Sequence, residues 1–303
     1  MPLHRREFCR LSLGLLAAGL AGPLAAAPRS RSQRLRIGSQ TNTWGAPIKD
    51  YDQLLRILDA LKQLGYQGFE TNYMSLNAQA ARAADCRRAF ESRRIHYVAP
   101  HTGAKLHDGD EKEAEDLRRI AGYSAQMGAS HFIVSGRRLP HPDGKLDLNT
   151  VHTKAEALNQ FGRFCRQEGL KLCYHNHVQE FQDEPWEMSF LLRETDPALV
   201  WLNYDVGNPY GHGPDAGSFS AENFRRIAIY HIKDVAPGEG GKMVATDLGA
   251  GKVDLKAVVA PVLNSDWEGW LVVEREGSYP KPAEHPEELL RQCRTYLKQI
   301  TKV

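Results

Sequence analysis

Short apolar segments alternate with segments of helical periodicity along almost the whole of this chain, and that alternation limits the folds that it can adopt. Gly65, Gly128 and Gly169 each stand between a predicted helix and the next predicted strand, where a left-handed C-cap is expected. The predicted strands are residues 35–41, 67–71, 95–101, 131–135, 170–175, 200–205, 228–231 and 269–274. The predicted helices are residues 51–64, 77–92, 111–127, 151–168, 186–195, 221–226, 255–263 and 286–301.

Strands that are each followed by a helix predict a closed parallel (β/α)8 barrel, the TIM-barrel architecture of the α/β class, in a single domain over residues 28–303. An open doubly wound sheet is the alternative. However, the first predicted strand is followed by SQTNTW at residues 39–44, which is not a glycine-rich phosphate turn. Long connections at residues 136–150, 206–220 and 233–254 all follow strands. In a barrel they lie on the C-terminal face, where active sites are built.

The first 27 residues have the pattern of an export signal. The pair Arg5-Arg6 precedes an apolar run at residues 11–21 and three alanines at residues 25–27, and this pattern resembles a twin-arginine signal peptide. The apolar run is short for a membrane span, although an N-terminal anchor that is never removed is the alternative. The pattern predicts a periplasmic or secreted protein with no stable membrane association after cleavage of residues 1–27.

The charge balance argues against nucleic acid as a partner. The formal net charge of +2 belongs to the leader, so residues 28–303 carry no net formal charge. A neutral protein has no general electrostatic attraction to nucleic acid or to an anionic membrane. Four cysteines remain after the leader, and none is in a C-x-x-C pair, which is typical of buried thiols in a domain of this size. No interface can be identified, so a homo-oligomer stays open.

Potential metal ligands stand where several predicted strands end. The carboxyl ends of all strands in a barrel meet at one mouth, so these side chains are expected to converge. Imidazoles and carboxylates at the end of a buried strand are costly unless they are hydrogen-bonded or hold a metal ion. In chain order they are His101; His175, His177 and Glu180; Asp205; His231; and Glu274.

Four of these side chains predict a site for one divalent metal ion. The predicted ligands are Glu180, Asp205, His231 and Glu274, which offer three carboxylates and one imidazole. Mostly oxygen ligands with one nitrogen suit Mn²⁺, Mg²⁺, Co²⁺ or Zn²⁺, and Mn²⁺ is the expected ion. A single acid at a strand end is more often a helix cap or a loop acceptor, but four at successive strand ends indicate a site.

Five segments of the chain resemble a known superfamily. In order they are YHNHVQEF, LNYDVGN, YHIKD, GAGKVDL and LVVEREG, and together they look like the xylose isomerase-like barrels, which include sugar isomerases and epimerases, inosose dehydratase and endonuclease IV. The resemblance covers essentially all of residues 28–303. It implies a (β/α)8 barrel with one divalent ion held by the four residues named above. It also implies that Lys233 and Asp254 bind substrate or support the ligands.

Two departures from the superfamily pattern matter. Many epimerases have a Glu directly at the end of the fifth strand, where this chain has His175. Either Glu180 folds back from the loop to coordinate the ion, which we favour, or His175 or His177 takes its place. The endonuclease IV branch needs a histidine where this chain has Asn208, and an Asp-x-His pair where it has residues 243–245 of sequence MVA. DNA repair is therefore disfavoured.

A metal ion flanked by two carboxylates suits proton abstraction next to a carbonyl group. The ion would bind the carbonyl and a neighbouring hydroxyl oxygen and stabilise the enediolate. One carboxylate would remove the proton and the other would return it, which gives epimerisation, while return to the adjacent carbon gives isomerisation. Glu180 and Glu274 are the predicted pair. The sequence thus predicts a metal-dependent isomerase or epimerase for a small carbohydrate: a sugar, keto-sugar or cyclitol.

Other side chains complete the predicted site. His177, or His101 across the barrel, would act as a proton shuttle or a hydroxyl donor, and His175 would contact the substrate. Lys233 would hold a developing oxyanion. Trp44 would form an apolar wall for the sugar.

Three alternatives remain open at this point. Loss of a β-oxygen would make the protein a lyase or dehydratase, and a metal-bound hydroxide would make it a hydrolase. A barrel that binds carbohydrate without turning it over is the third. Arg137 and Arg138, which follow the fourth predicted strand, are interpreted as solvated or loop-bracing rather than as a phosphate site.

Overall fold

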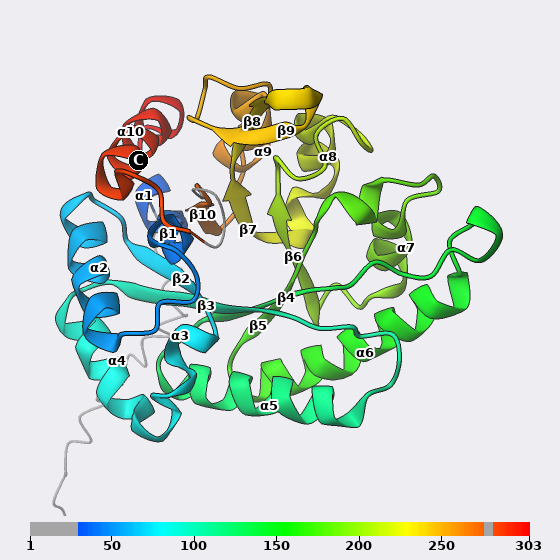
Figure 1. Cartoon of the computed structure of the whole chain (residues 1–303), viewed down its shortest axis with the longest axis horizontal. Coiled ribbons are helices and arrows are strands. Elements are labelled where there is room, and N and C mark those ends of the chain that lie inside the picture. Colours follow the sequence, from blue (N-terminus) through cyan, green and yellow to red (C-terminus); the bar gives the residue numbers. More distant parts are fainter. Residues whose placement is uncertain (1–29, 276–280) are drawn as a thin grey trace, which may run out of the picture.

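Parallel strands close into a barrel with helices around it, as the alternation predicts (Figure 1). The computed structural model describes residues 30–275 and 281–303, so the predicted signal peptide at residues 1–27 lies outside the described residues. The prediction of a (β/α)8 TIM barrel is confirmed. Within the described part of the chain, no helix has both the length and the apolar character that a membrane crossing requires.

Most element bounds agree with the predicted ones to within a few residues. The barrel strands are β1 (Leu35–Gln40), β2 (Gly68–Asn72), β3 (His96–Gly103), β4 (His131–Ser135), β5 (Lys171–His175), β6 (Val200–Asp205), β7 (Ile227–Ile232) and β10 (Gly269–Val273). The helices are α1 (Arg31–Arg34), α2 (Tyr51–Gln63), α3 (Met74–Asn77), α4 (Ala83–Ser92), α5 (Glu111–Gln126), α6 (Leu148–Gln167), α7 (Glu187–Glu194), α8 (Ala216–Asn223), α9 (Leu255–Leu263) and α10 (Pro286–Thr301).

The strand order around the barrel is β1-β10-β7-β6-β5-β4-β3-β2. Every neighbouring pair is parallel. β10 pairs with β7 on one side and with β1 on the other, so it completes the ring. Because all strands run in one direction, their carboxyl ends lie at the same mouth.

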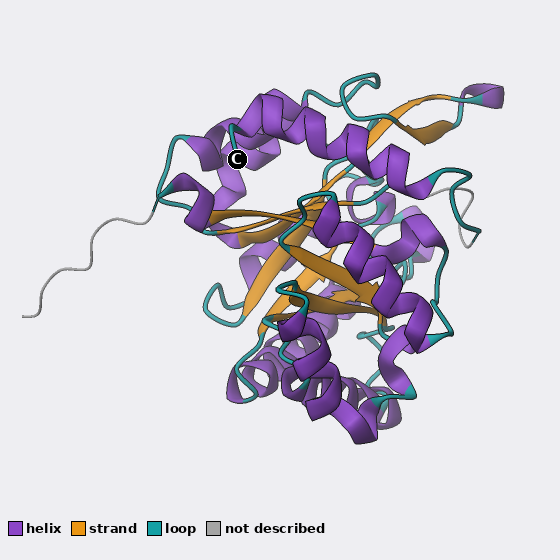
Figure 2. Cartoon of the chain, turned by 90° about the vertical axis from the view of Figure 1, so that its left-hand side faces the viewer, coloured by secondary structure: helices purple, strands orange, loops and turns teal. Residues whose placement is uncertain are grey.

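Three parts of the chain differ most from the expected pattern. The helix predicted at residues 221–226 begins earlier, as α8 at Ala216, and its last residues form a 3-10 turn at Phe224–Arg226. The single helix predicted at residues 77–92 is broken into α3, a 3-10 turn at Ala80–Arg82, and α4. The connection predicted at residues 233–254 contains an antiparallel hairpin of β8 (Asp234–Pro237) and β9 (Met243–Thr246). This hairpin projects beyond the barrel wall (Figure 2).

The interior of the barrel is apolar toward the amino ends of the strands and polar at the mouth, where the carboxyl ends lie. Side chains alternate along a strand, so residues two apart share a face. Cys173, Ile229 and Val272 belong to the inner apolar cluster, together with Trp270, which is fully buried. Gly68 makes room for Trp270, since a Cβ at Gly68 would lie 2.6 Å from its ring. The apolar floor leaves the mouth as the place for chemistry.

Candidate metal centre and substrate cavity

Four buried side chains from consecutive barrel strands converge at the mouth. His175 and His231 lie two residues after inward-facing Cys173 and Ile229, and Glu274 follows Val272 in the same way. Asp205 ends β6 between them. One potential ligand atom from each of these four residues lies within 4.8 Å of the others. Because residues two apart on a strand share a face, the inward-facing apolar residues are followed at the strand ends by inward-facing polar residues. We call these four polar residues the mouth cluster: His175, Asp205, His231 and Glu274.

The atoms that face one another in the mouth cluster lack hydrogen-bond partners. These atoms are His175 Nδ1, Asp205 Oδ2, His231 Nδ1 and Glu274 Oε2. The last two approach to 2.5 Å as an ion pair but do not form a hydrogen bond of good geometry. Buried polar atoms without partners are costly. Two imidazole nitrogens and two carboxylate oxygens are a donor set that a divalent transition metal ion accepts, so these residues fit such an ion.

Hydrogen bonds to the backbone orient Asp205. Its Oδ1 accepts hydrogen bonds from the amides of Gly207 (2.8 Å) and Asn208 (2.7 Å). The Asn176 side chain accepts from the backbone N–H of Asp205 at 2.9 Å and donates to its carbonyl at 3.0 Å. With one oxygen occupied by the loop, Oδ2 is the oxygen left for the cluster.

Lys233 supplies positive charge to the two carboxylates. Its Nζ lies 3.3 Å from Asp205 Oδ2 and 3.2 Å from Glu274 Oε1. Burial acts to raise the pKa of each acid, whereas the charge of Lys233 acts to lower it. For Asp205 the effect of burial is the larger one, so its pKa lies above the usual value. For Glu274 the charges of Lys233 and His231 prevail, and its pKa lies well below the usual range.

The two imidazoles of the mouth cluster have opposite charge tendencies. Burial, together with the neighbouring rings of His101 and His231, holds the pKa of His175 well below the usual value. Burial also lowers the pKa of His231, but the carboxylates of Glu70 and Glu274 outweigh it and raise the pKa to about 10. His175 therefore offers a lone pair directly, whereas His231 would release a proton when a metal ion binds.

Glu180, a predicted ligand and base, does not join the mouth cluster. Its Oε1 accepts a hydrogen bond from the Tyr174 hydroxyl at 2.6 Å, and its Oε2 accepts from the backbone N–H of His177 at 2.8 Å. Lys154 Nζ lies 3.7 Å from Oε1 and bonds to Glu187. These contacts hold the carboxylate behind β5, so His175 occupies the position that we expected Glu180 to take.

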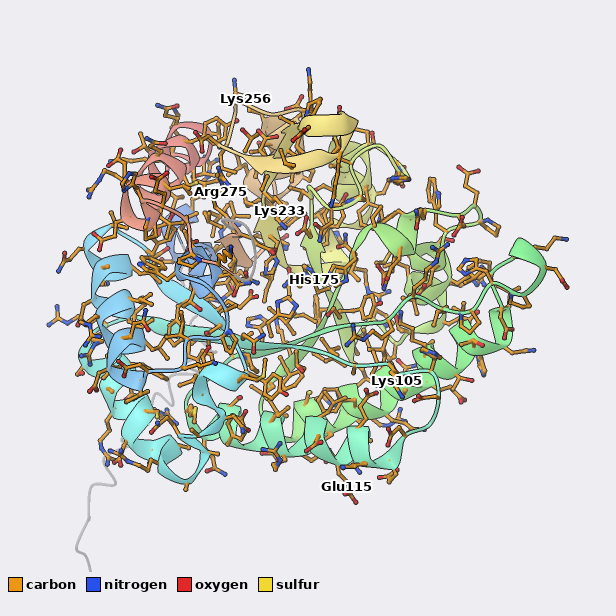
Figure 3. All side chains as sticks on the ribbon, in the orientation of Figure 1. Lys105, Glu115, His175, Lys233, Lys256 and Arg275 are labelled. Carbon is orange, nitrogen blue, oxygen red and sulfur yellow. The ribbon has the colours of Figure 1, made fainter. Side chains whose placement is uncertain are left out.

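A cavity of about 460 Å³ opens above the mouth cluster. His175, His177, Lys233 and Glu274 line it together with His101. His175 and Lys233 are labelled in Figure 3, where both lie over the barrel. Burial lowers the pKa of His177. The cavity therefore presents a carboxylate, an ammonium group and three imidazoles to a ligand.

Two predicted substrate contacts lie elsewhere in the described structure. Trp44 is partly buried and packs against the main hydrophobic core. Asp254 caps α9 by accepting the backbone N–H of Ala257 at 3.0 Å. Among the described residues that line the cavity, neither Trp44 nor Asp254 is present. Arg138 forms an ion pair with Asp183 at 3.2 Å, in agreement with a bracing role, while Arg137 lines the cavity.

Sequence reasoning missed Glu70 as a site residue. This fully buried carboxylate on β2 accepts hydrogen bonds from Gln40 at 2.7 Å and contacts His101 at 2.8 Å and His231 at 2.7 Å. Burial alone would raise its pKa, but His231 and His101 lower it to about 2. An acid near the end of the second strand was visible in the sequence. Its signal was weak because Thr71, not Glu70, ended the predicted strand.

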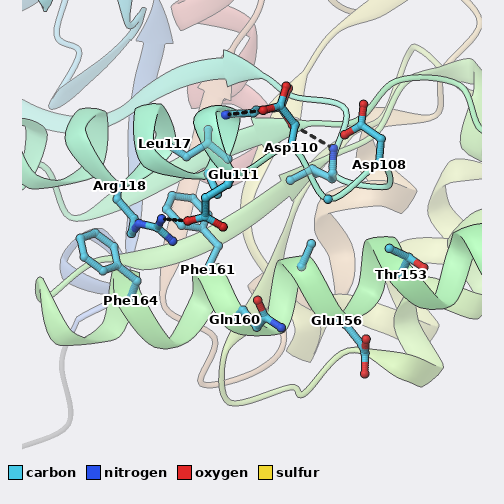
Figure 4. Close-up of a pocket in the computed structure, with 15 residues that line it drawn as sticks. Asp108, Asp110, Glu111, Leu117, Arg118, Thr153, Glu156, Gln160, Phe161 and Phe164 are labelled. Atoms are coloured by element: carbon cyan, nitrogen blue, oxygen red, sulfur yellow. Dashed lines mark hydrogen bonds and ion pairs between the residues drawn. The ribbon is translucent and has the colours of Figure 1, made fainter.

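A second hollow of about 230 Å³ lies between α5 and α6 (Figure 4). Leu117, Phe161 and Phe164 form its apolar wall. Its acids are already engaged: Asp110 caps α5, and Glu111 pairs with Arg118. Among the described residues the hollow holds no group of candidate metal ligands, so the chemistry belongs to the mouth of the barrel.

Comparison with known families and proteins agrees with this geometry. The family described as "Xylose isomerase-like TIM barrel" matches residues 58–300. An inosose dehydratase of Halalkalibacterium halodurans is 28% identical over 215 residues, which cover 63% of this chain and 70% of that protein. An inosose dehydratase of Clostridium perfringens is 29% identical over 189 residues, which cover 57% of this chain and 63% of that protein. The matched share is 45% of an inosose dehydratase of Salmonella agona and 71% of one of Geobacillus thermodenitrificans.

Solved structures share the fold at low sequence identity. An L-ribulose 3-epimerase has a TM-score of 0.72 and 16% identity, with 88% of this chain and 95% of that chain covered. An IOLI protein with a bound zinc atom has a TM-score of 0.71 and 15% identity, with 88% of this chain and 98% of that chain covered.

Proposed function

The chain belongs to the xylose isomerase-like TIM barrel family, and from this premise we propose that it is a divalent-metal-dependent enzyme that removes a proton next to a carbonyl group of a sugar, keto-sugar or cyclitol. The observation that carries the proposal is the set of four buried ligand atoms without hydrogen-bond partners at the floor of a 460 Å³ cavity. When bound there, a metal ion supplies Lewis acidity to the oxygens of the substrate.

The first candidate reaction is isomerisation or epimerisation. Glu274 lines the cavity and is ionised by its contacts with Lys233 and His231, so it can accept a proton from the substrate. Because Glu180 is held behind β5, the return of the proton falls to an imidazole of the cavity, His177, rather than to a second carboxylate. Lys233 would steady negative charge on the substrate oxygen.

The second candidate is dehydration, which the inosose dehydratase relatives favour. Elimination needs one base for the proton and one acid for the departing hydroxyl group. Glu274 and an imidazole of the cavity would supply these roles without a second carboxylate. The same site residues therefore serve both candidates, and the substrate decides between them.

The identity of the ion is part of the proposal. The expectation of Mn²⁺ rested on three carboxylates and one imidazole. A donor set with two imidazoles moves the preference toward Zn²⁺ or Co²⁺, although Mn²⁺ remains compatible. Reconstitution with Mn²⁺, Co²⁺, Zn²⁺ and Mg²⁺ in parallel would rank them.

Metal content tests the site. We expect one ion per chain in the wild type and in Glu180→Ala, and loss of the ion in His231→Ala and Asp205→Ala, because only the last two remove a mouth-cluster atom. Elemental analysis after dialysis measures this. Glu180→Ala is the matched control, since it removes a nearby buried carboxylate. Absence of metal from the wild type, even after reconstitution, would overturn the proposal.

Deuterium exchange tests the reaction. The loaded protein should wash deuterium from D₂O into a C–H position next to the carbonyl of a substrate such as a keto-inositol or a ketohexose. Product analysis then separates an epimer or isomer from a dehydrated product. Tight binding of such compounds without any exchange would indicate a binding barrel instead of an enzyme.

A further inference from the structure

Glu70 connects the mouth cluster to the cavity through two histidines. Its side chain is fully buried and does not belong to the mouth cluster. Oε2 lies 2.7 Å from Nε2 of His231, and Oε1 lies 2.8 Å from Nδ1 of His101. One carboxylate therefore touches the ε-nitrogen of one ring and the δ-nitrogen of the other.

We propose that Glu70 is a positioning residue that sets opposite tautomers on these two histidines. It keeps a hydrogen on Nε2 of His231, so that Nδ1 of His231 is the ligand atom of the mouth cluster. It keeps a hydrogen on Nδ1 of His101, so that Nε2 of His101 is a hydrogen-bond acceptor for a substrate in the cavity. The His101 part rests on the proposed function, whereas the His231 part requires only that the cluster binds a metal ion.

The contacts of His231 decide its tautomer. An ionised carboxylate only accepts hydrogen bonds, so a lone pair on Nε2 would face another acceptor at 2.7 Å. Asn203 Nδ2 lies 2.9 Å from the same nitrogen, while Asn203 Oδ1 has no hydrogen-bond partner. With Nε2 protonated, the amino group of Asn203 would face another donor, so the amide would turn its oxygen toward the ring and share the single hydrogen of Nε2 with Glu70. A metal-ligating histidine is commonly fixed in this way by a carboxylate on its other nitrogen.

The contacts of His101 decide its tautomer by the same reasoning. Gln40 Nε2 lies 2.7 Å from Glu70 Oε1 and 3.2 Å from His101 Nδ1. If Gln40 donated to His101 Nδ1, that nitrogen would present a lone pair to the carboxylate at 2.8 Å. Donation by both groups to Oε1 avoids this repulsion. Since His101 lines the cavity, its Nε2 is the nitrogen left for a ligand.

A second metal site at Glu70, His101 and His231 is the competing explanation, because these groups also lie close enough to share an ion. The hydrogen-bond pattern argues against it. Both oxygens of Glu70 have hydrogen-bond partners, in contrast to the facing atoms of the mouth cluster. An ion here would replace contacts that are already complete.

Nitrogen-15 NMR of the histidine rings in Zn²⁺-loaded protein tests the tautomers directly and needs no variant. The expected result is a protonated Nε2 with a metal-bound Nδ1 for His231, and a protonated Nδ1 with a bare Nε2 for His101. The opposite pattern at His231, a bare Nε2, would overturn the inference for the ligand. A protonated Nε2 on His101 with a bare Nδ1 would overturn it for the substrate contact.

Metal affinity measures what the positioning achieves. We expect Glu70→Gln to weaken Zn²⁺ binding by roughly 10- to 100-fold, because a neutral amide holds the imidazole less firmly as a ligand. Glu187→Gln, which also neutralises a buried carboxylate but contacts no histidine of the cluster, should keep the wild-type affinity. Equal affinity in Glu70→Gln and the wild type would contradict the inference. Failure of the wild type to bind Zn²⁺ would instead contradict the proposed function.

Discussion

At Lys154, one ammonium group stands between two buried carboxylates. Its fully buried Nζ bonds to Glu187 and lies 3.7 Å from Glu180. Gly136 leaves the room for it, since a Cβ there would lie 2.3 Å from Nζ. Burial raises the pKa of Glu187 to about 7, although Lys154 lowers it. This one cation therefore keeps two acids in place behind β5.

Replacing that cation should be strongly destabilising. Lys154→Met leaves buried charge without a partner, so we expect the free energy of unfolding to fall by about 3–5 kcal/mol. Urea denaturation measures it. Lys112→Met on the exposed surface of α5 is the control and should change stability by less than about 0.5 kcal/mol. A loss in Lys154→Met no larger than in the control would show that the network is not structural.

The same network explains what the sequence could and could not reveal about the candidate metal ligands. Asp205, His231 and Glu274 were predictable because each continues the inward row of a strand, which follows from local alternation alone. His175 obeys the same rule, but Glu180 was favoured because a carboxylate could serve both as ligand and as base. The position of Glu180 depends on Lys154 and Tyr174, and no local pattern encodes such a contact.

At the scale of the strands, the histidines at the two ends of the barrel differ in their surroundings. His131 begins β4 at the floor, where burial, with Lys171 and Arg36 nearby, lowers its pKa from 6.5 to about 3. His96 begins β3, and burial and Arg36 lower its pKa to about 4. Strand beginnings thus hold neutral rings in the packing, whereas strand ends present rings to the cavity.

Low pH should destabilise the protein by way of the buried histidine at the beginning of β4. Between pH 6.5 and about 3 the unfolded chain protonates His131 while the folded state keeps it neutral, so the unfolded state binds more protons and stability falls as the pH is lowered. We expect His131→Gln to reduce the slope of unfolding free energy against pH by about 1.4 kcal/mol per unit in that window. Denaturation at pH 6, 5 and 4 measures the slope. His212→Gln, at an exposed site, should leave it unchanged, and an unchanged slope in His131→Gln would refute the argument.

Regular elements were predictable and their interruptions were not. The predicted bounds are correct to the residue for β4, β6, α9 and α10. In these elements the periodic pattern of apolar residues ends at the same place as the residues that signal an element end. The β8–β9 hairpin was missed because its stability comes from a distant contact. Asp234 accepts hydrogen bonds from the backbone of Gly249, Gly251 and Val253, which fastens the hairpin to the following loop.

At the scale of the whole molecule, the barrel and its proposed export are linked by folding. A twin-arginine route carries proteins that have already folded, so the ion proposed for the mouth cluster would be acquired before export. The barrel itself followed from the order of strands and helices, because parallel neighbours need crossover helices of this length. Its export is a prediction from residues 1–27, which lie outside the described structure.

Exchange of both leader arginines for lysine tests that prediction. Arg5→Lys with Arg6→Lys keeps the charge but removes the paired arginines that the export signal requires. We expect the double variant to accumulate inside the cell with its metal bound, while the wild type reaches the periplasm or the medium. Cell fractionation followed by elemental analysis measures both. Undiminished export of the double variant would refute the twin-arginine assignment.

The position of β10 in the ring has a consequence for how the proposed metal ion could be bound. β10 is the last strand of the barrel in the chain, it joins β7 to β1, and Glu274 follows it directly. The other three mouth-cluster residues come from β5, β6 and β7, which pair with one another without it. A ribosome-bound or truncated chain that lacks this strand would therefore carry an incomplete coordination sphere. If the mouth cluster binds the proposed ion, such a chain should retain it less well than the closed barrel, and the rate of metal loss to a chelator would distinguish the two.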